Sequence, residues 1–105
     1  MEPVADLHVL RDQLDQKRTF LIVLWRENNP EIDRYLARMQ RLVRQYPPLK
    51  SFSVCLDTHP TAAARFGAFQ PPAVVIYANG KMVLKVSDTC DSAPIRAKLD
   101  SIYRT

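Results

Sequence analysis

A chain of 105 residues, 47% hydrophobic and 25% charged, is typical of one globular domain over residues 1–105 and leaves no surplus for a second. Its net charge of +4 favours acidic partners but is far below that of a typical nucleic-acid-binding domain. The two cysteines, Cys55 and Cys90, form neither a disulfide framework nor a zinc-binding spacing, so we expect no metal or other cofactor. No segment resembles a secretory signal or a membrane span, and we expect a cytoplasmic protein.

An amphipathic helix and a buried strand are predicted for the first quarter of the chain. Within residues 1–18, apolar side chains recur at helical spacing, at Val4, Leu7, Leu10 and Leu14. The six apolar residues from Phe20 to Trp25, rich in β-branched and aromatic types, then predict a strand that is buried on both faces.

A long helix is predicted directly after this strand, from Pro30 to Tyr46. Asn29 suits the N-cap, Pro30 suits the first helical position, and Pro47-Pro48 ends the helix. Its apolar face consists of Ile32, Tyr35, Leu36, Met39, Leu42, Val43 and Tyr46. Its other face carries an arginine row, Arg34, Arg38, Arg41 and Arg44. The row is either a solvated helix face or a docking strip for an acidic partner.

A second strand and a short helix are predicted next. Lys50 to Asp57 alternates apolar and small residues, as a strand does. The turn Asp57-Thr58-His59-Pro60 can cap a helix from Thr61 to Phe66, which Gly67 ends. We expect His59 to support the turn, because no carboxylate pattern indicates acid–base chemistry.

A hairpin and a last helix complete the predicted fold. Asn79-Gly80 is a strong hairpin signal and joins a strand from Ala73 to Tyr77 to one from Met82 to Val86. Asp91 or Ser92 caps the last helix, whose inward residues are Ile95, Leu99, Ile102 and Tyr103. The order αβαβαββα predicts an α/β fold with a four-stranded mixed sheet and helices on both of its faces.

This order of elements, together with several short motifs, resembles the thioredoxin family over nearly the whole chain. The motifs are Leu24-Trp25, Asp57-Thr58-His59-Pro60, Phe66-Gly67, Pro72 before an apolar strand, and Asn79-Gly80. The resemblance implies a thioredoxin-like three-layer sandwich. It also implies a cis Pro71–Pro72 bond, because Pro72 falls where the family carries its cis-proline.

The residues that carry the family's chemistry are replaced. Counting from Trp25, the family's Cys-Gly-Pro-Cys falls on Asn29-Pro30-Glu31-Ile32, and its buried acid falls on Val23. Disulfide exchange needs a thiolate, so the ordinary thioredoxin reaction is not expected. In the family, the residue before the cis-proline pairs its backbone with substrate, and Pro71 has no N–H to give.

We therefore expect a redox-inactive protein-binding adaptor or assembly chaperone and not an enzyme. The candidate protein-binding residues are Trp25, Arg26, Asn28, Asn29, Pro71, Pro72, Arg34, Arg38 and Arg41. For Trp25, a packed aromatic that closes the strand end is an equally good interpretation. The expected partner is another protein with an acidic surface. Nucleic acid is disfavoured because the arginines lack interleaved aromatics, and membrane binding is not expected.

The two cysteines leave an alternative function open. The chain would then be an enzyme related to thiol-disulfide oxidoreductases that uses Cys90 or Cys55 with an external thiol. We expect Cys55 to be an interior thiol on its strand, and the acidic neighbours of Cys90 argue against a reactive thiolate. A bridge between Cys55 and Cys90 is not expected.

Overall fold

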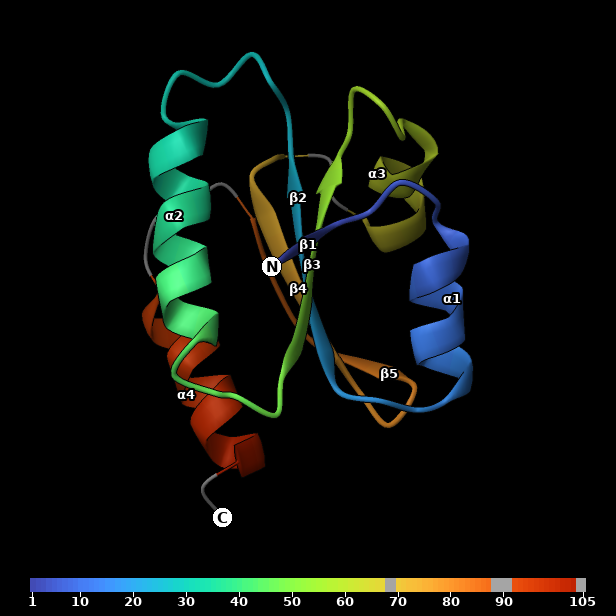
Figure 1. Cartoon of the computed structure of the whole chain (residues 1–105), viewed down its shortest axis with the longest axis vertical. Helices are drawn as coiled ribbons and strands as arrows, with labels where there is room; N and C mark the ends of the chain where they lie inside the picture. Colours follow the sequence, from blue (N-terminus) through green and yellow to red (C-terminus); the bar gives the residue numbers. More distant parts are fainter. Residues whose placement is uncertain (68–69, 88–91, 104–105) are drawn as a thin grey trace.

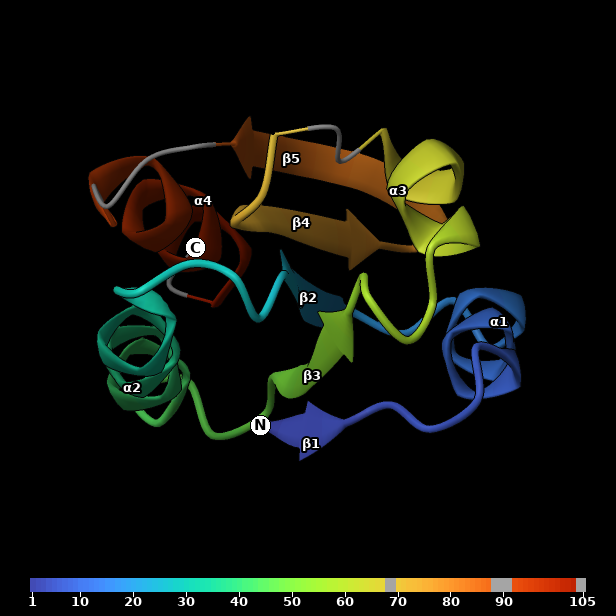
Figure 2. The same cartoon turned by 90° about the horizontal axis from the view of Figure 1, so that it is seen from above.

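The computed structural model describes residues 1–67, 70–87 and 92–103. In these ranges a five-stranded mixed sheet runs through the middle of the molecule, with helices on both sides (Figure 1). The strands are β1 Glu2–Pro3, β2 Phe20–Trp25, β3 Lys50–Cys55, β4 Ala73–Ala78 and β5 Lys81–Ser87. They lie in the order β1-β3-β2-β4-β5, which Figure 2 shows from above. Strand β2 is central, parallel to β3 and antiparallel to β4.

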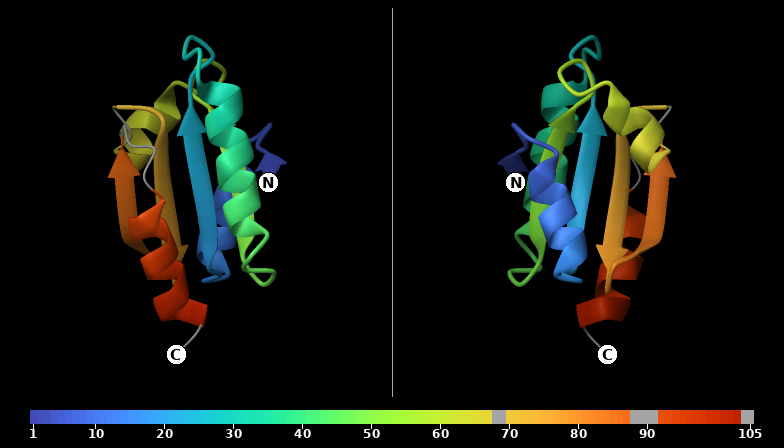
Figure 3. Two further views of the ribbon diagram at one scale, coloured as in Figure 1. Left: turned by 90° about the vertical axis from the view of Figure 1, so that its left-hand side faces the viewer. Right: turned by 90° about the vertical axis from the view of Figure 1, so that its right-hand side faces the viewer.

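The helices form the two outer layers. Helices α1 His8–Asp15 and α3 Thr61–Phe66 cover one face of the sheet. Helices α2 Ile32–Val43 and α4 Ala93–Tyr103 cover the other, as the two side views in Figure 3 show. The three-layer α/β architecture is therefore the one that the sequence predicted. Among the described residues, no helix combines the length and the apolar character needed to cross a bilayer.

Strand β2 separates the protein interior into two cores. Phe20, Ile22 and Leu24 pack towards α1 and α3, whereas Leu21 and Val23 pack towards α2 and α4. All five side chains are 0% exposed. This confirms the prediction of a strand buried on both faces.

The predicted helix over residues 1–18 is wrong at its beginning. Glu2 and Pro3 pair in parallel with Phe52 and Ser53 of β3, so the sheet has five strands instead of four, and the order is βαβαβαββα. Val4 is 8% exposed, but it packs from this extended segment and not from a helix. The three-residue spacing from Val4 to Leu7 therefore matches a helical period, although Val4 does not lie in a helix.

The long helix begins two residues later than predicted, at Ile32. The Asn29 side chain caps the preceding turn: its Oδ1 accepts a hydrogen bond from the Glu31 N–H at 2.9 Å. The N–H of Ile32 bonds the Asn29 carbonyl at 3.1 Å, which completes that turn. The helix ends at Val43, and Tyr46 follows in a turn. The apolar face is confirmed, with only Leu36 half-buried and the other six residues buried.

The second half of the chain follows the prediction closely. Helix α3 has the predicted bounds and ends at Gly67, whose φ of 66° is left-handed. Asn79 and Gly80 have φ of 56° and 80°, as a type I′ hairpin turn requires. In α4, Ile95 and Leu99 are buried and Ile102 and Tyr103 are half-buried. The predicted cap Asp91 lies outside the described residues.

Truncation of the central strand should test this arrangement. Leu24→Ala removes a side chain that is 0% exposed, so we expect a loss of about 2–5 kcal/mol in the free energy of unfolding, measured by urea denaturation. Val9 is 37% exposed, and Val9→Ala should change stability by less than about 0.5 kcal/mol. Equal effects of the two variants would contradict the assigned core.

Candidate functional site

Three chain segments meet at one end of the sheet. Strand β2 ends at Trp25, which pairs with Cys55, the last residue of β3. On its other side Leu24 pairs with Ala73, the first residue of β4, which follows Pro72 directly. The turn after β2 therefore leaves the sheet beside the Pro71-Pro72 segment. The Pro71–Pro72 peptide bond is cis.

Asp57 holds this sheet end together. Its Oδ2 accepts a hydrogen bond from the Glu27 N–H at 2.7 Å, and its Oδ1 lies 3.4 Å from a guanidinium nitrogen of Arg26. The two charged side chains are 38% and 42% exposed, so water screens their attraction. The short bond to the backbone N–H is the contact that fixes the turn. Sequence reasoning assigned Asp57 only to the turn before α3 and missed this link between two strand ends.

The turn after β2 uses its polar groups for chain geometry. Asn29 accepts the Glu31 N–H, and Glu31 lies 3.5 Å from a guanidinium nitrogen of Arg34, within an exposed ion pair. Asp33 adds a second carboxylate to the first turn of α2, next to the positive end of the helix. No thiol or hydroxyl side chain occurs from Arg26 to Ile32. The turn therefore carries no sulfur or hydroxyl nucleophile.

Trp25 is half-buried at the end of β2 and packs against the core beneath α2 and α4. Its Nε1 is enclosed, and among the described residues it has no hydrogen-bond partner. The indole therefore closes the strand end as a packed aromatic. Because Nε1 is enclosed, the exposed part of the indole offers apolar surface and no hydrogen-bond donor.

The remaining residues of the sheet end differ in exposure. Asn28 is exposed, and four others are half-buried, namely Arg26, Asn29, Pro71 and Pro72. We call Trp25 together with these five residues the sheet-end surface. The structure thus brings six of the nine predicted binding residues to one end of the sheet.

The arginine row runs away from this end along α2. Arg34 and Arg44 are ten positions apart in the sequence, which corresponds to about 15 Å along the helix axis. Arg34 lies at the first turn, whereas Arg41 and Arg44 flank a shallow hollow of ≈ 240 Å³ near the other end of the helix. Arg38 is half-buried, and the other three arginines are exposed. The predicted binding residues therefore form two regions, the sheet-end surface and the arginine row, which are adjacent at the start of α2.

Cys55 and His59 take structural positions beside the sheet end. Cys55 is a free, half-buried thiol and not an interior one, because it lies on the less covered face of β3, where Ser51 and Ser53 are half-buried as well. Its Sγ lies 3.9 Å from Oδ2 of Asp57. His59 Nε2 lies 3.2 Å from the Val4 carbonyl oxygen and links the turn after β3 to the segment after β1. Cys90 lies outside the described residues.

A metal centre finds no support at this site. In the part of the chain that the structure describes, no three His, Cys, Asp or Glu side chains are grouped so that they could hold a metal ion.

Several solved structures of other proteins have folds similar to that of this chain. No protein-family model and no curated protein matches the sequence. Thioredoxin from Trypanosoma brucei brucei superposes with a TM-score of 0.85 at 17% identity, over 98% of this chain and 90% of that one. Thioredoxin from Fasciola hepatica gives 0.84 at 17% identity, over 96% and 98% of the two chains. A designed protein gives 0.82 at 22% identity, over 96% and 90%.

Removal of the Asp57 carboxylate should loosen the turn after β2. In Asp57→Ala the Glu27 N–H loses its acceptor, and loss of about 1 kcal/mol should speed its amide hydrogen exchange about fivefold. Asp6→Ala is the matched control, because Asp6 accepts a backbone bond from His8 instead. Unchanged Glu27 exchange in Asp57→Ala would contradict the assigned role.

Proposed function

We propose that this chain, which has a thioredoxin-like fold, is a redox-inactive protein that binds another protein, as an adaptor or an assembly chaperone. One observation carries the proposal. At the strand–helix joint, where the resemblance places the reactive cysteines, residues 29–32 are Asn, Pro, Glu and Ile, and the Asn29 side chain closes a backbone turn. The fold is present without the thiols that its usual chemistry needs.

The remaining thiol in the described ranges supports this view. Cys55 lies on β3, not in the turn after β2, and its polar contact is the Asp57 carboxylate. Ile32 occupies the position of the resolving thiol and is only 8% exposed, within the core. A disulfide exchange cycle would need an attacking and a resolving sulfur, and neither position supplies one.

The sheet-end surface is the proposed contact region. Pro71 and Pro72 have no N–H, so this segment offers a partner carbonyl oxygens but no backbone donors. Recognition would therefore depend on side chains, chiefly Asn28 and the half-buried Arg26, with Trp25 supplying apolar area. An extended partner strand could not form a complete ladder of backbone hydrogen bonds here, because Pro71 and Pro72 lack N–H donors.

The arginine row extends the proposed contact along α2. Its exposed guanidinium groups favour a partner with acidic side chains, and bidentate pairing with carboxylates would add orientation to the contact. The proposal further comprises one domain over residues 1–105 and a cytoplasmic location, where free cysteines are the rule.

The absence of redox activity can be tested by insulin reduction with dithiothreitol, alongside a dithiol thioredoxin as a positive control. The wild type should not exceed the background rate, because no thiol pair is present at the strand–helix joint. Cys55→Ser and Cys90→Ser should then behave as the wild type does. A rate above background that either substitution abolishes would support the alternative enzymatic function.

Partner binding can be tested by affinity capture from native lysate with quantitative mass spectrometry. Asn28→Glu with Arg34→Glu places negative charge at the sheet end and should reduce enrichment of a specific partner about tenfold, which corresponds to about 1.4 kcal/mol. Arg18→Glu is the control, because Arg18 precedes β2 at the opposite end of the strand. No specific partner, or equal enrichment by the double variant, would contradict the proposal.

A further inference from the structure

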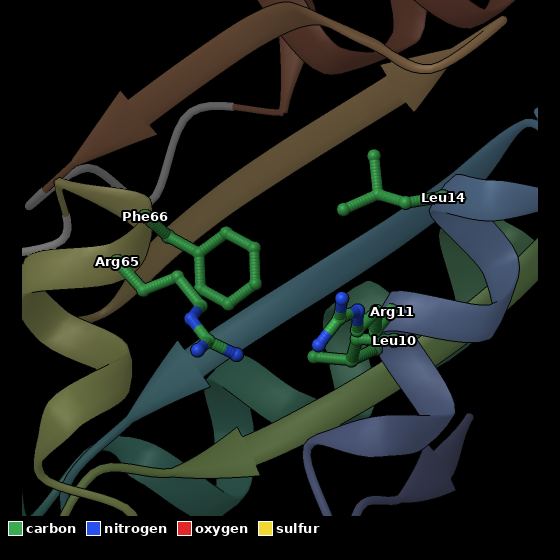
Figure 4. Close-up of a pocket in the computed structure, with 5 residues that line it drawn as sticks. All are labelled: Leu10, Arg11, Leu14, Arg65 and Phe66. Carbon is green, nitrogen blue, oxygen red and sulfur yellow. The ribbon is translucent and has the colours of Figure 1, made fainter.

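A second candidate surface lies on the opposite face of the sheet, between α1 and α3. Here the structure has a hollow of ≈ 300 Å³, lined by Leu10, Arg11, Leu14, Arg65 and Phe66. Figure 4 shows that these side chains come from the two helices and point towards the space between them. We call this site the α1/α3 hollow.

The floor of the α1/α3 hollow is apolar and fixed. Leu10 and Phe66 are 2% and 3% exposed and form the base of the hollow as part of the core. The apolar side chain that a ligand can reach is therefore Leu14, which is half-buried and packs against that core. The Phe66 ring meets the Tyr77 ring edge-on, with 6.1 Å between centroids. The floor therefore does not depend on a ligand for its shape.

The rim of the hollow carries two positive charges, those of Arg11 and Arg65. Arg11 and Arg65 are exposed, and their guanidinium groups turn into the same space (Figure 4). Among the described residues neither makes an ion pair or a side-chain hydrogen bond, whereas Arg26 and Arg34 each have a carboxylate partner. Two unpaired guanidinium groups above an apolar floor suit a ligand with an apolar group flanked by carboxylates.

We propose that the α1/α3 hollow binds a short acidic segment of a partner protein, with one Leu or Phe side chain on the apolar floor and neighbouring Asp or Glu carboxylates on Arg11 and Arg65. This inference rests on the proposed protein-binding function and adds the chemistry of a partner. The volume is at the lower limit for small-molecule sites, enough for one anchoring side chain. The exposed arginines on the rim leave room for the rest of a chain to continue outside. Anchoring by one buried side chain beside an arginine is a common energetic centre of protein interfaces.

Nucleic acid fits this site less well. Base stacking needs an accessible aromatic face, and Phe66, the aromatic ring of the hollow, is only 3% exposed. A peptide side chain needs only apolar contact, which the half-buried Leu14 and the aliphatic stems of Arg11 and Arg65 can supply. The observations therefore favour an acidic peptide.

The test is an NMR titration of the ¹⁵N-labelled full chain with the peptide Ac-Glu-Asp-Phe-Leu-Asp-Glu-NH₂. Chemical shift changes should concentrate on α1 and α3, because the anchor contacts both helices. Arg11→Gln with Arg65→Gln should raise the Kd at least tenfold. Arg18→Gln with Lys50→Gln removes the same two positive charges outside both the hollow and the arginine row, and should change the Kd less than twofold.

Two further ligands test whether binding needs both the apolar anchor and the carboxylates of a peptide. A peptide with Ser in place of Phe and Leu keeps every carboxylate and should bind at least tenfold more weakly. Octanoate tests a free amphiphile and should cause no saturable shifts at the hollow. Both double variants should keep the wild-type melting temperature within a few degrees, since all four substituted side chains are exposed.

Four results would overturn the inference. These are no shifts at any residue, saturable octanoate binding at the hollow, equal weakening by the two double variants, and peptide shifts on residues 26–31 instead of α1 and α3. The last result would support the proposed function at the sheet-end surface while removing the hollow from it. Failure of the inference is thus distinguishable from failure of the function, which the capture experiment tests by itself.

Discussion

Complete burial of the central strand governs what this protein can present to other molecules. From Phe20 to Leu24 every side chain of β2 is enclosed, alternately by the two helical layers. Burial of each such apolar side chain contributes on the order of 1.5–3 kcal/mol, so the strand is a main source of stability and leaves no functional group accessible along its length. The first side chain of this segment that reaches the surface is Trp25, at the end of β2. The turn that follows β2 therefore supplies the first groups that another molecule can reach.

At that turn the polar groups stabilise the backbone. Asp57 reaches across from the end of β3 to the Glu27 N–H, and Asn29 accepts the N–H of Glu31. Each such bond contributes about 1 kcal/mol, and together they hold the turn between the sheet and α2. A turn held in this way has fewer accessible conformations than one without these two bonds.

Patterns that repeat along the chain were readable from the sequence, and contacts between distant residues were not. The hairpin at Asn79-Gly80 and the apolar face of α2 follow from local backbone demands and helical period. Strand β1 escaped prediction because two residues carry no period, and only pairing with β3 makes them a strand. The role of Asp57 and the α1/α3 hollow depend on packing between segments that lie 30 or more residues apart, about which composition and spacing are silent.

The two edge strands of the sheet affect whether copies of this protein associate with one another. One margin consists of β1, two residues long, where Pro3 lacks the amide hydrogen that a neighbouring strand would seek. The other is β5, whose Lys81 and Lys85 are both exposed along its seven residues. Short length, proline and lysine are the means by which natural sheets discourage addition of foreign strands. The sheet is thereby protected at both edges against strand-on-strand addition of another copy of this chain.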